Sequence, residues 1–188
     1  MLQRHEAKTI GPSDGKNNLV AALSDTHGKP HPNLFPILEQ WRPSIILHAG
    51  DMGDIGLINE LERFAPTVYV RGNIDPTGPL WPDSVALRIK VSTVGQLDIL
   101  LLHIAVARLN LNKIALNLLN QKPAQIVVFG HSHVPFLGMD GKRGLFNPGS
   151  AGPSRMGLPT TMGLIEFSQA QLSFKHLDLR TGEQWKPR

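Results

Sequence analysis

The chain has 188 residues, of which 41% are hydrophobic and 18% charged, a composition typical of one globular domain. It contains no cysteine, which excludes disulfides, thiolate nucleophiles and cysteine-based zinc or iron–sulfur sites. No apolar run approaches the roughly 18–20 residues that cross a bilayer, and the first residues lack the apolar core of a signal peptide. We therefore expect a cytoplasmic protein without a membrane partner, in which any metal is held by histidine and oxygen ligands.

The net charge of +4 lies mainly at the two ends of the chain. Residues 1–17 hold three Lys/Arg against two acids, and residues 175–188 hold four against two. The body between them is almost neutral, with no cationic stretch and no interleaving of basic and aromatic residues. A nucleic-acid partner is therefore disfavoured.

The first 17 residues are polar and lack periodicity, so we expect a flexible tail or an added edge segment. Three short apolar runs then predict buried strands, at 19–23, 44–48 and 67–70. Helical patterns follow the first two, at 34–41 and 58–64. Strands that alternate with helices indicate parallel βαβ units.

Beyond Pro82 the pattern predicts a hairpin of strands 86–91 and 97–103, a helix from about 108 to 120, and a strand at 125–129. The last third has the spacing of short antiparallel strands. We expect an α/β fold with two sheets packed face to face and helices outside. The predicted domain spans residues 18–178, followed by a tail at 179–188.

Polar residues that can bind metals recur where the predicted strands end, and in open α/β sheets ligands bind at the carboxyl ends of strands. Two of the sets, Asp25 with His27 and His131 with His133, have the i, i+2 spacing that points both side chains to one side of an extended backbone. Each motif taken alone is weak, because such short patterns are often turns or surface loops. The complete set is Asp25, His27, Asp51, Asn73, His103, His131 and His133.

The ordered motifs DTH (25–27), GDMGD (50–54), GNID (72–75) and GHSH (130–133), with His103 after an apolar strand and NPGS at 147–150, resemble the calcineurin-like metallophosphoesterase superfamily. The similarity is greatest to its small single-domain bacterial and archaeal phosphodiesterases. It runs from about Leu19 to Leu177 and implies a four-layer αββα sandwich of two mixed sheets flanked by helices, with a dinuclear metal site.

By this resemblance one ion would be held by Asp25, His27, Asp51 and His133, and the other by Asp51, Asn73, His103 and His131. Asp51 would bridge the ions, and Asp51, Asn73 and His103 are assigned catalytic roles. Two divalent transition metal ions per chain are expected, with Mn²⁺ preferred and Fe, Zn²⁺, Ni²⁺ and Co²⁺ also suited to these ligands. The implied reaction is hydrolysis of a small phosphoester, a diester rather than a monoester, by a hydroxide that bridges the ions.

Two positions depart from the family pattern. Ile74 stands where many members carry a histidine, and Ile104 and Ala105 follow His103 where relatives often read His-Gly-His. We expect Asp75 to anchor its loop or to support a ligand, and Arg155 to contact a phosphate oxygen or to be a surface residue.

Other polar residues keep a structural interpretation open. His48 could support the metal ligands or be a satisfied core histidine, and Asp54 is expected to cap the following helix. His5, His31 and His176 are expected to be solvated. A non-catalytic scaffold of the same fold is the alternative function, but a scaffold free to drift would have lost at least one ligand. The sequence leaves the oligomeric state open, a homo-oligomer included.

Overall fold

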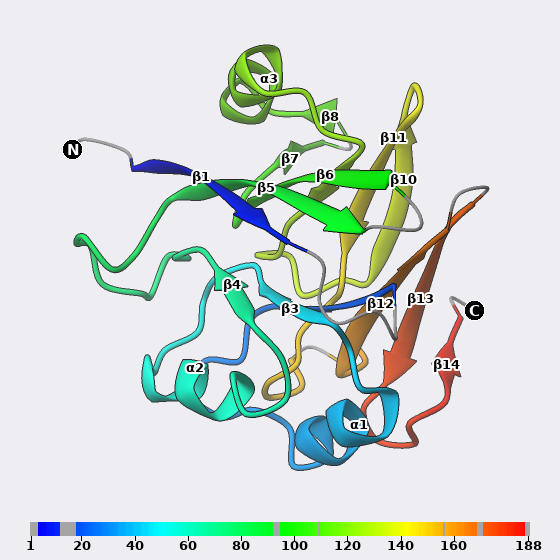
Figure 1. Ribbon diagram of the computed structural model, residues 1–188. Coiled ribbons are helices and arrows are strands. Elements are labelled where there is room, and N and C mark those ends of the chain that lie inside the picture. Colours follow the sequence, from blue (N-terminus) through cyan, green and yellow to red (C-terminus); the bar gives the residue numbers. More distant parts are fainter. Residues whose placement is uncertain are drawn as a thin grey trace.

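The computed structural model describes residues 4–11, 18–91, 95–108, 110–155, 157–168 and 171–186, which form two six-stranded sheets with helices outside (Figure 1). The helices of these residues are α1 (Leu34–Trp41), α2 (Gly56–Leu61) and α3 (Lys113–Gln121). The strands are β1 (His5–Ile10), β2 (Leu19–Leu23), β3 (Ile45–His48), β4 (Thr67–Tyr69), β5 (Ser84–Val91), β6 (Gly95–Leu102), β7 (Val106–Ala107), β8 (Asn110–Leu111), β9 (Ile126–Val128), β10 (Phe136–Asp140), β11 (Arg143–Asn147), β12 (Thr161–Phe167), β13 (Leu172–Asp178) and β14 (Gln184–Trp185).

The strand order is β1-β5-β6-β9-β11-β10 in one sheet, called sheet A, and β14-β13-β12-β2-β3-β4 in the other, called sheet B. The expected parallel βαβ units are β2-β3-β4, and the expected hairpin is β5-β6. Helices α1 and α2 cover the outer face of sheet B, and α3 covers sheet A (Figure 1). The predicted four-layer α/β architecture is confirmed.

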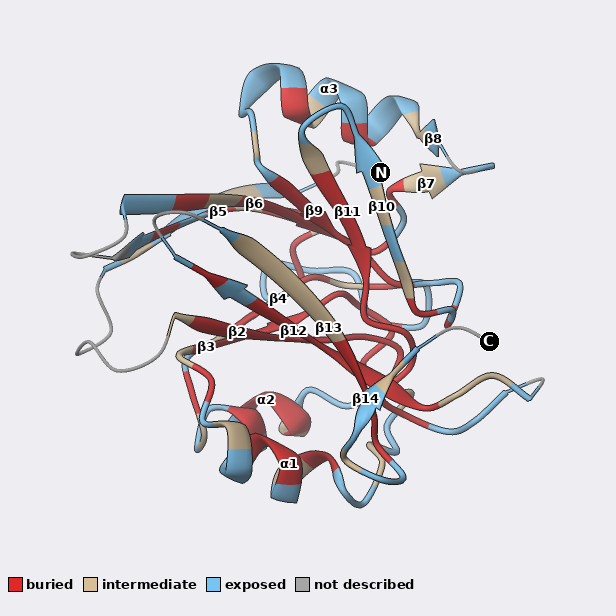
Figure 2. Ribbon diagram, turned by 90° about the vertical axis from the view of Figure 1, so that its right-hand side faces the viewer, coloured by how far each residue is buried: buried red, intermediate tan, exposed pale blue. Residues whose placement is uncertain are grey.

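The apolar runs are continuous because both faces of the central strands are buried (Figure 2). Along β2, Val20 and Ala22 point into the core between the sheets, whereas Leu19, Ala21 and Leu23 pack under the helices of sheet B. The same division holds in β6, whose Leu100 and Leu102 face α3. Burial of this kind contributes about 25 cal/mol per Å² of apolar surface and fixes the strand register.

One expected element has different bounds, and one strand was not expected. Residues 106–111 form the short hairpin β7-β8, with residue 109 outside the described part, so the helix begins at Lys113 rather than near Arg108. The side chain of Asn112 accepts a hydrogen bond from the Ala115 N–H and so caps α3. Strand β10 was not predicted, because its exposed edge residues show no clear alternation.

Both ends of the chain add edge strands, where a tail or an added edge segment was expected at the amino end and a tail at the carboxyl end. Strand β1 pairs in parallel with β5 over six residues, and β14 pairs with β13. Asp83 adds to the first contact, because its carboxylate accepts from the Arg4 N–H and its own N–H donates to the Arg4 carbonyl. Residues 1–3, 12–17 and 187–188 of the expected tails lie outside the described residues.

His176 is buried rather than solvated. Its Nε2 hydrogen-bonds the Asn147 carbonyl and its ring stacks on Phe146, because β13 turns this side chain inward. No helix within the described ranges has the length and apolar character needed to cross a membrane.

Candidate metal centre

The candidate ligands meet where strands of both sheets end. In sheet B, the loops after the parallel strands β2, β3 and β4 hold Asp25 with His27, Asp51 and Asn73. In sheet A, the parallel neighbours β6 and β9 lead to His103 and to the pair His131 and His133. The two sheets therefore deliver polar side chains to one seam, as the chain order of the motifs predicted.

One group of side chains gathers around Asp25. Its Oδ1 lies 3.3 Å from His133 Nε2, and the Nε2 atoms of His27 and His133 are also 3.3 Å apart. Ligand atoms of these three residues all lie within 4.8 Å of one another, close enough to contact a single ion.

A second group consists of Asp25, Asp51 and His103, whose ligand atoms also lie within 4.8 Å of one another. Asp51 faces both groups, because its Oδ1 lies 3.5 Å from His103 Nε2 and its Oδ2 lies 3.7 Å from His27 Nε2. Asn73 and His131 are exposed at the rim, where Asn73 Nδ2 lies 3.2 Å from His131 Nδ1. The His131 ring stands edge-on to that of His103, with centroids 5.3 Å apart.

The backbone at the centre is held in an uncommon conformation. Five candidate ligands have positive φ angles, a region that residues other than glycine rarely adopt: Asp25, His27, Asp51, His131 and His133. Such conformations cost on the order of 1–3 kcal/mol each and persist only where the surroundings enforce them.

Hydrogen bonds between the loops supply this enforcement. The N–H groups of Asp25 and His27 donate to the Gly50 and Asp51 carbonyls at 3.0 and 2.9 Å. Glycine is required where the loops touch, because a Cβ on Gly72 would overlap the Asp51 carboxylate and one on Gly130 would overlap Ser24. The ligands are thus positioned by their own loops.

Several buried lone pairs at the centre have no hydrogen-bond partner among the described residues. His103 Nδ1 donates to the Ala49 carbonyl at 2.7 Å, which leaves its buried Nε2 unpartnered. Asp25 Oδ2 accepts from Ser24 Oγ and the His131 N–H, whereas its buried Oδ1 has no donor. Buried polar atoms are normally satisfied, so these aligned acceptors fit divalent cations that favour imidazole and carboxylate ligands.

Burial and neighbouring charges shift the pKa values of these groups in both directions. Burial opposes ionisation of Asp51, but the nearby His103 ring and the Ile74 N–H outweigh it and hold the pKa of its carboxyl well below the usual range. Burial lowers the pKa of His133 to about 4, and burial and then the charge of Arg155 lower that of His27. Burial raises the pKa of Asp25 to about 6. His27 and His133 are therefore held neutral and Asp51 ionised, the forms that bind cations. Burial lowers the pKa of His103, but its hydrogen bonds with Asp51 and the Ala49 carbonyl outweigh burial and raise it.

Asp75 ties two ligand loops together. This buried carboxylate accepts from the backbone N–H groups of Met52, Gly53 and Gly72, at 3.1, 2.8 and 2.7 Å. The prediction that Asp75 anchors its loop is confirmed by these contacts.

The other outer residues have distinct positions. His48 is fully buried, with Nδ1 accepting from the Gly50 N–H and Nε2 facing Thr26 Oγ1 at 3.0 Å, so it is a satisfied histidine that braces the loops. Asp54 accepts from the Gly56 N–H at the start of α2, which is a structural role.

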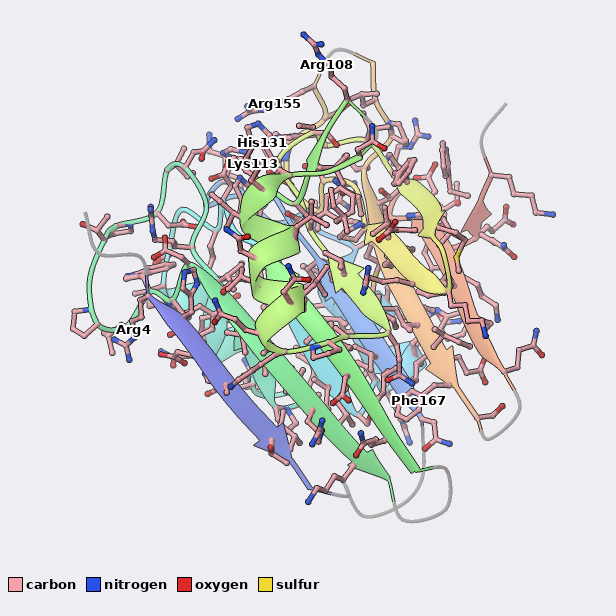
Figure 3. All side chains as sticks on the ribbon, turned by 90° about the horizontal axis from the view of Figure 1, so that it is seen from above. Arg4, Arg108, Lys113, His131, Arg155 and Phe167 are labelled. Atoms are coloured by element: carbon pink, nitrogen blue, oxygen red, sulfur yellow. The ribbon has the colours of Figure 1, made fainter. Side chains whose placement is uncertain are left out.

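Arg155 is exposed, and its positive charge lowers the pKa of His27 and of His133. Figure 3 shows Arg155 and His131 on the same side of the molecule.

Sequence reasoning missed three supporting residues. Ser24 Oγ donates to Asp25 Oδ2 at 2.6 Å, and Ser150 Oγ donates to the Asp25 carbonyl at 2.9 Å. Asn147 Nδ2 donates to the Gly130 carbonyl at 2.7 Å and so braces the loop that carries His131 and His133. The NPGS motif at 147–150 was the available signal, since it contains both Asn147 and Ser150.

The model of the calcineurin-like phosphoesterase superfamily domain matches residues 19–170. The chain belongs to the calcineurin-like phosphoesterase superfamily. A probable metallophosphoesterase of Methanothermobacter thermautotrophicus is 31% identical over 150 residues, which cover 78% of this chain and 84% of the relative. Metallophosphoesterases of this superfamily are hydrolases that use divalent metal ions.

Solved structures share the fold. A predicted phosphoesterase of Streptococcus pneumoniae superposes with a TM-score of 0.63 and 23% identity, over 89% of this chain and 92% of that one. Vps29 of Entamoeba histolytica, solved in complex with zinc, gives a TM-score of 0.68 and 23% identity over 89% and 96%. Proteins that carry different functional names thus share this fold.

Proposed function

We propose that the protein is a phosphodiesterase with a dinuclear metal centre, in which Asp25, His27, Asp51 and His133 hold one ion and Asp51, Asn73, His103 and His131 hold the other. The observation that carries this proposal is the meeting of Asp25, Asp51 and three histidines around buried, unpartnered lone pairs. The Vps29 neighbour was solved in complex with zinc, so a chain of this fold can bind a divalent metal.

When bound, the ions would supply an activated water nucleophile and positive charge for the phosphoryl oxygens. The chain's residues prepare the site for this chemistry. Asp51 presents one carboxylate oxygen to each group, which fits a bridging ligand. His103 is fixed in one tautomer by the Ala49 carbonyl, and Asp25 is oriented by Ser24. Mn²⁺ is the ion we expect to activate best.

A diester is the favoured substrate because of what surrounds the centre. Ile74, which follows Asn73, and Ile104, which follows His103, are 52% and 38% exposed at the rim. Arg155 supplies one nearby positive charge. A singly charged, partly apolar phosphodiester suits this rim better than the dianion of a monoester, which calls for more cationic donors.

The apolar rim has a consequence for the leaving group. With isoleucine at 74 and 104, neither position offers an acid to protonate a departing alkoxide. Aryl diesters, whose phenolate leaves without a proton, should react well, whereas alkyl diesters should be slow. Ile74→His should help alkyl esters more than aryl esters at equal metal content.

The test is to measure metal content by elemental analysis and Mn²⁺-dependent hydrolysis of bis-p-nitrophenyl phosphate and p-nitrophenyl phosphate. We expect two ions per chain and faster diester cleavage. Asp51→Asn should lose most activity and bind both ions more weakly, whereas Asp54→Asn, in the same loop but exposed, should behave like the parent. One ion or none at saturation, or parental turnover by Asp51→Asn, would contradict the proposal.

A scaffold function is the alternative that the Vps29 neighbours raise. The presence of all seven candidate ligands argues against a drifted site. Metal binding without hydrolysis of any phosphoester would favour the scaffold.

A further inference from the structure

An apolar hollow of about 390 Å³ lies beside the candidate metal centre. It is lined by the loop after β6, by β7, and by the segment from the end of β9 to β10. The lining residues that matter here are Ile104, Val106, Phe129, His131, Val134 and Phe136. Its volume is within the range of small-molecule sites, roughly 300–1,000 Å³.

The hollow borders the centre. Gly130, His131 and Ser132 line it, and His131 is itself a candidate ligand. Ile104 directly follows His103, and Val134 directly follows His133, so that two of its walls are set by the ligands' own loops. A phosphoester held at the centre would therefore have one substituent next to the hollow.

Large apolar side chains remain accessible there. Ile104 and Val134 are 38% and 42% exposed, although burying either would be favourable. At the floor, Phe129 and Phe136 present rings with centroids 6.3 Å apart and tilted by 55°. Arg108 stands at the edge of the hollow, on the same side of the molecule as His131 (Figure 3). This combination suits a flat apolar group next to an anionic one.

We propose that the hollow takes the apolar, preferably aryl, ester group that remains on the phosphorus after hydrolysis. This inference rests on the proposed phosphodiesterase function and names its substrate class, a phosphodiester with one aryl or similarly apolar substituent. The remaining group is favoured over the leaving group because an apolar wall opposes the negative charge that develops on a leaving oxygen. The leaving group would face the open rim near Ile74.

The test compares phenyl p-nitrophenyl phosphate with methyl p-nitrophenyl phosphate, which release the same p-nitrophenolate. We expect kcat/KM to favour the phenyl ester on the order of tenfold or more, beyond the ratio of the two rates in hydroxide alone. Ile104→Asn and Val134→Asn should bring the ratio toward the hydroxide value. Leu137→Asn is the matched control, since Leu137 is an exposed residue of β10 that does not line the hollow, and it should leave the ratio unchanged.

A binding measurement separates the two proposals. Calorimetric titration of the Mn²⁺-loaded protein should show tighter binding of phenylphosphonate than of methylphosphonate, and Ile104→Asn and Val134→Asn should reduce the difference. Equal affinities for the two phosphonates, or a kcat/KM ratio that stays at the hydroxide value, would overturn the proposed role of the hollow. The phosphodiesterase proposal would still stand in that case if the diesters are hydrolysed. If neither diester is hydrolysed, the phosphodiesterase proposal fails, and the phosphonate affinities still decide whether the hollow binds aryl groups.

Discussion

Asp75→Asn should destabilise the protein more than its small change in shape suggests. The Asp75 Oδ2 accepts from the Met52 and Gly72 N–H groups, and its Oδ1 accepts from Gly53. An asparagine has one acceptor oxygen, so at least one of these N–H groups would face an amide NH₂. The loops that carry Asp51 and Asn73 would then lose part of their connection.

The magnitude follows from the bonds. Hydrogen bonds to a charged group contribute roughly 1.5–3 kcal/mol each, against about 0.5–1.5 for neutral ones. Loss of one bond and weakening of two gives about 3.5–6 kcal/mol, or a fall in Tm of roughly 7–24 °C for a chain of this size. Because the loops position two candidate ligands, Mn²⁺ affinity should fall as well.

The assay is urea unfolding of the metal-free protein at pH 7, followed by Mn²⁺ titration. Asp54→Asn is the matched control, because Asp54 is exposed and asparagine can still accept from the Gly56 N–H. We expect the control to stay within about 0.5 kcal/mol of the parent. If Asp75→Asn matched the control in both stability and Mn²⁺ affinity, the loops would not depend on this carboxylate.

Three further predictions concern pH, the first strand and a glycine. Burial lowers the pKa of His48 to about 4, so its contribution to the free energy of unfolding is complete above about pH 6.5 and is lost as pH falls toward 4. In urea unfolding, the rise in the free energy of unfolding from pH 4.5 to pH 7 should be roughly 2.5 kcal/mol smaller for His48→Gln than for the parent, and an equal rise in both proteins would contradict the assignment. Deleting residues 1–11 removes β1 and should cost on the order of 1–3 kcal/mol in the same assay at pH 7, and an unchanged midpoint would show that the edge strand is dispensable. Gly72→Ala should weaken Mn²⁺ binding at least about tenfold in a titration, because its Cβ would overlap Asp51, whereas Gly11→Ala meets no neighbour and should bind like the parent.

The sequence predicted the parts of the fold that are buried on both sides. Runs such as 19–23 and 99–102 are unbroken because each strand lies between two cores, and that pattern is visible without a structure. Strand β10 was missed, and β1 was one of two alternatives for the first residues, because edge strands with exposed side chains lack such a pattern and depend on backbone pairing with β11 and β5.

The candidate ligands were predictable as a set because parallel strands bring their ends together. Apart from Asp75, most of the residues that support them were not predictable. The bond from Asn147 to the Gly130 carbonyl joins residues 17 apart, and the positive φ of His131 depends on that packing. The hollow beside His131 was equally invisible, since its walls come from segments on either side of α3.

The candidate ligands are divided between the two sheets, with Asp25 and Asp51 on sheet B and His103 and His133 on sheet A. Any species that binds them all links the two sheets, in addition to the apolar core between them. When its free concentration is 100 times its Kd, a ligand bound in this way adds about 2.7 kcal/mol to the free energy of unfolding. Resistance to proteolysis in the cell would then report how much of the protein carries its ions, and starvation for metal would shorten the lifetime of the molecule itself.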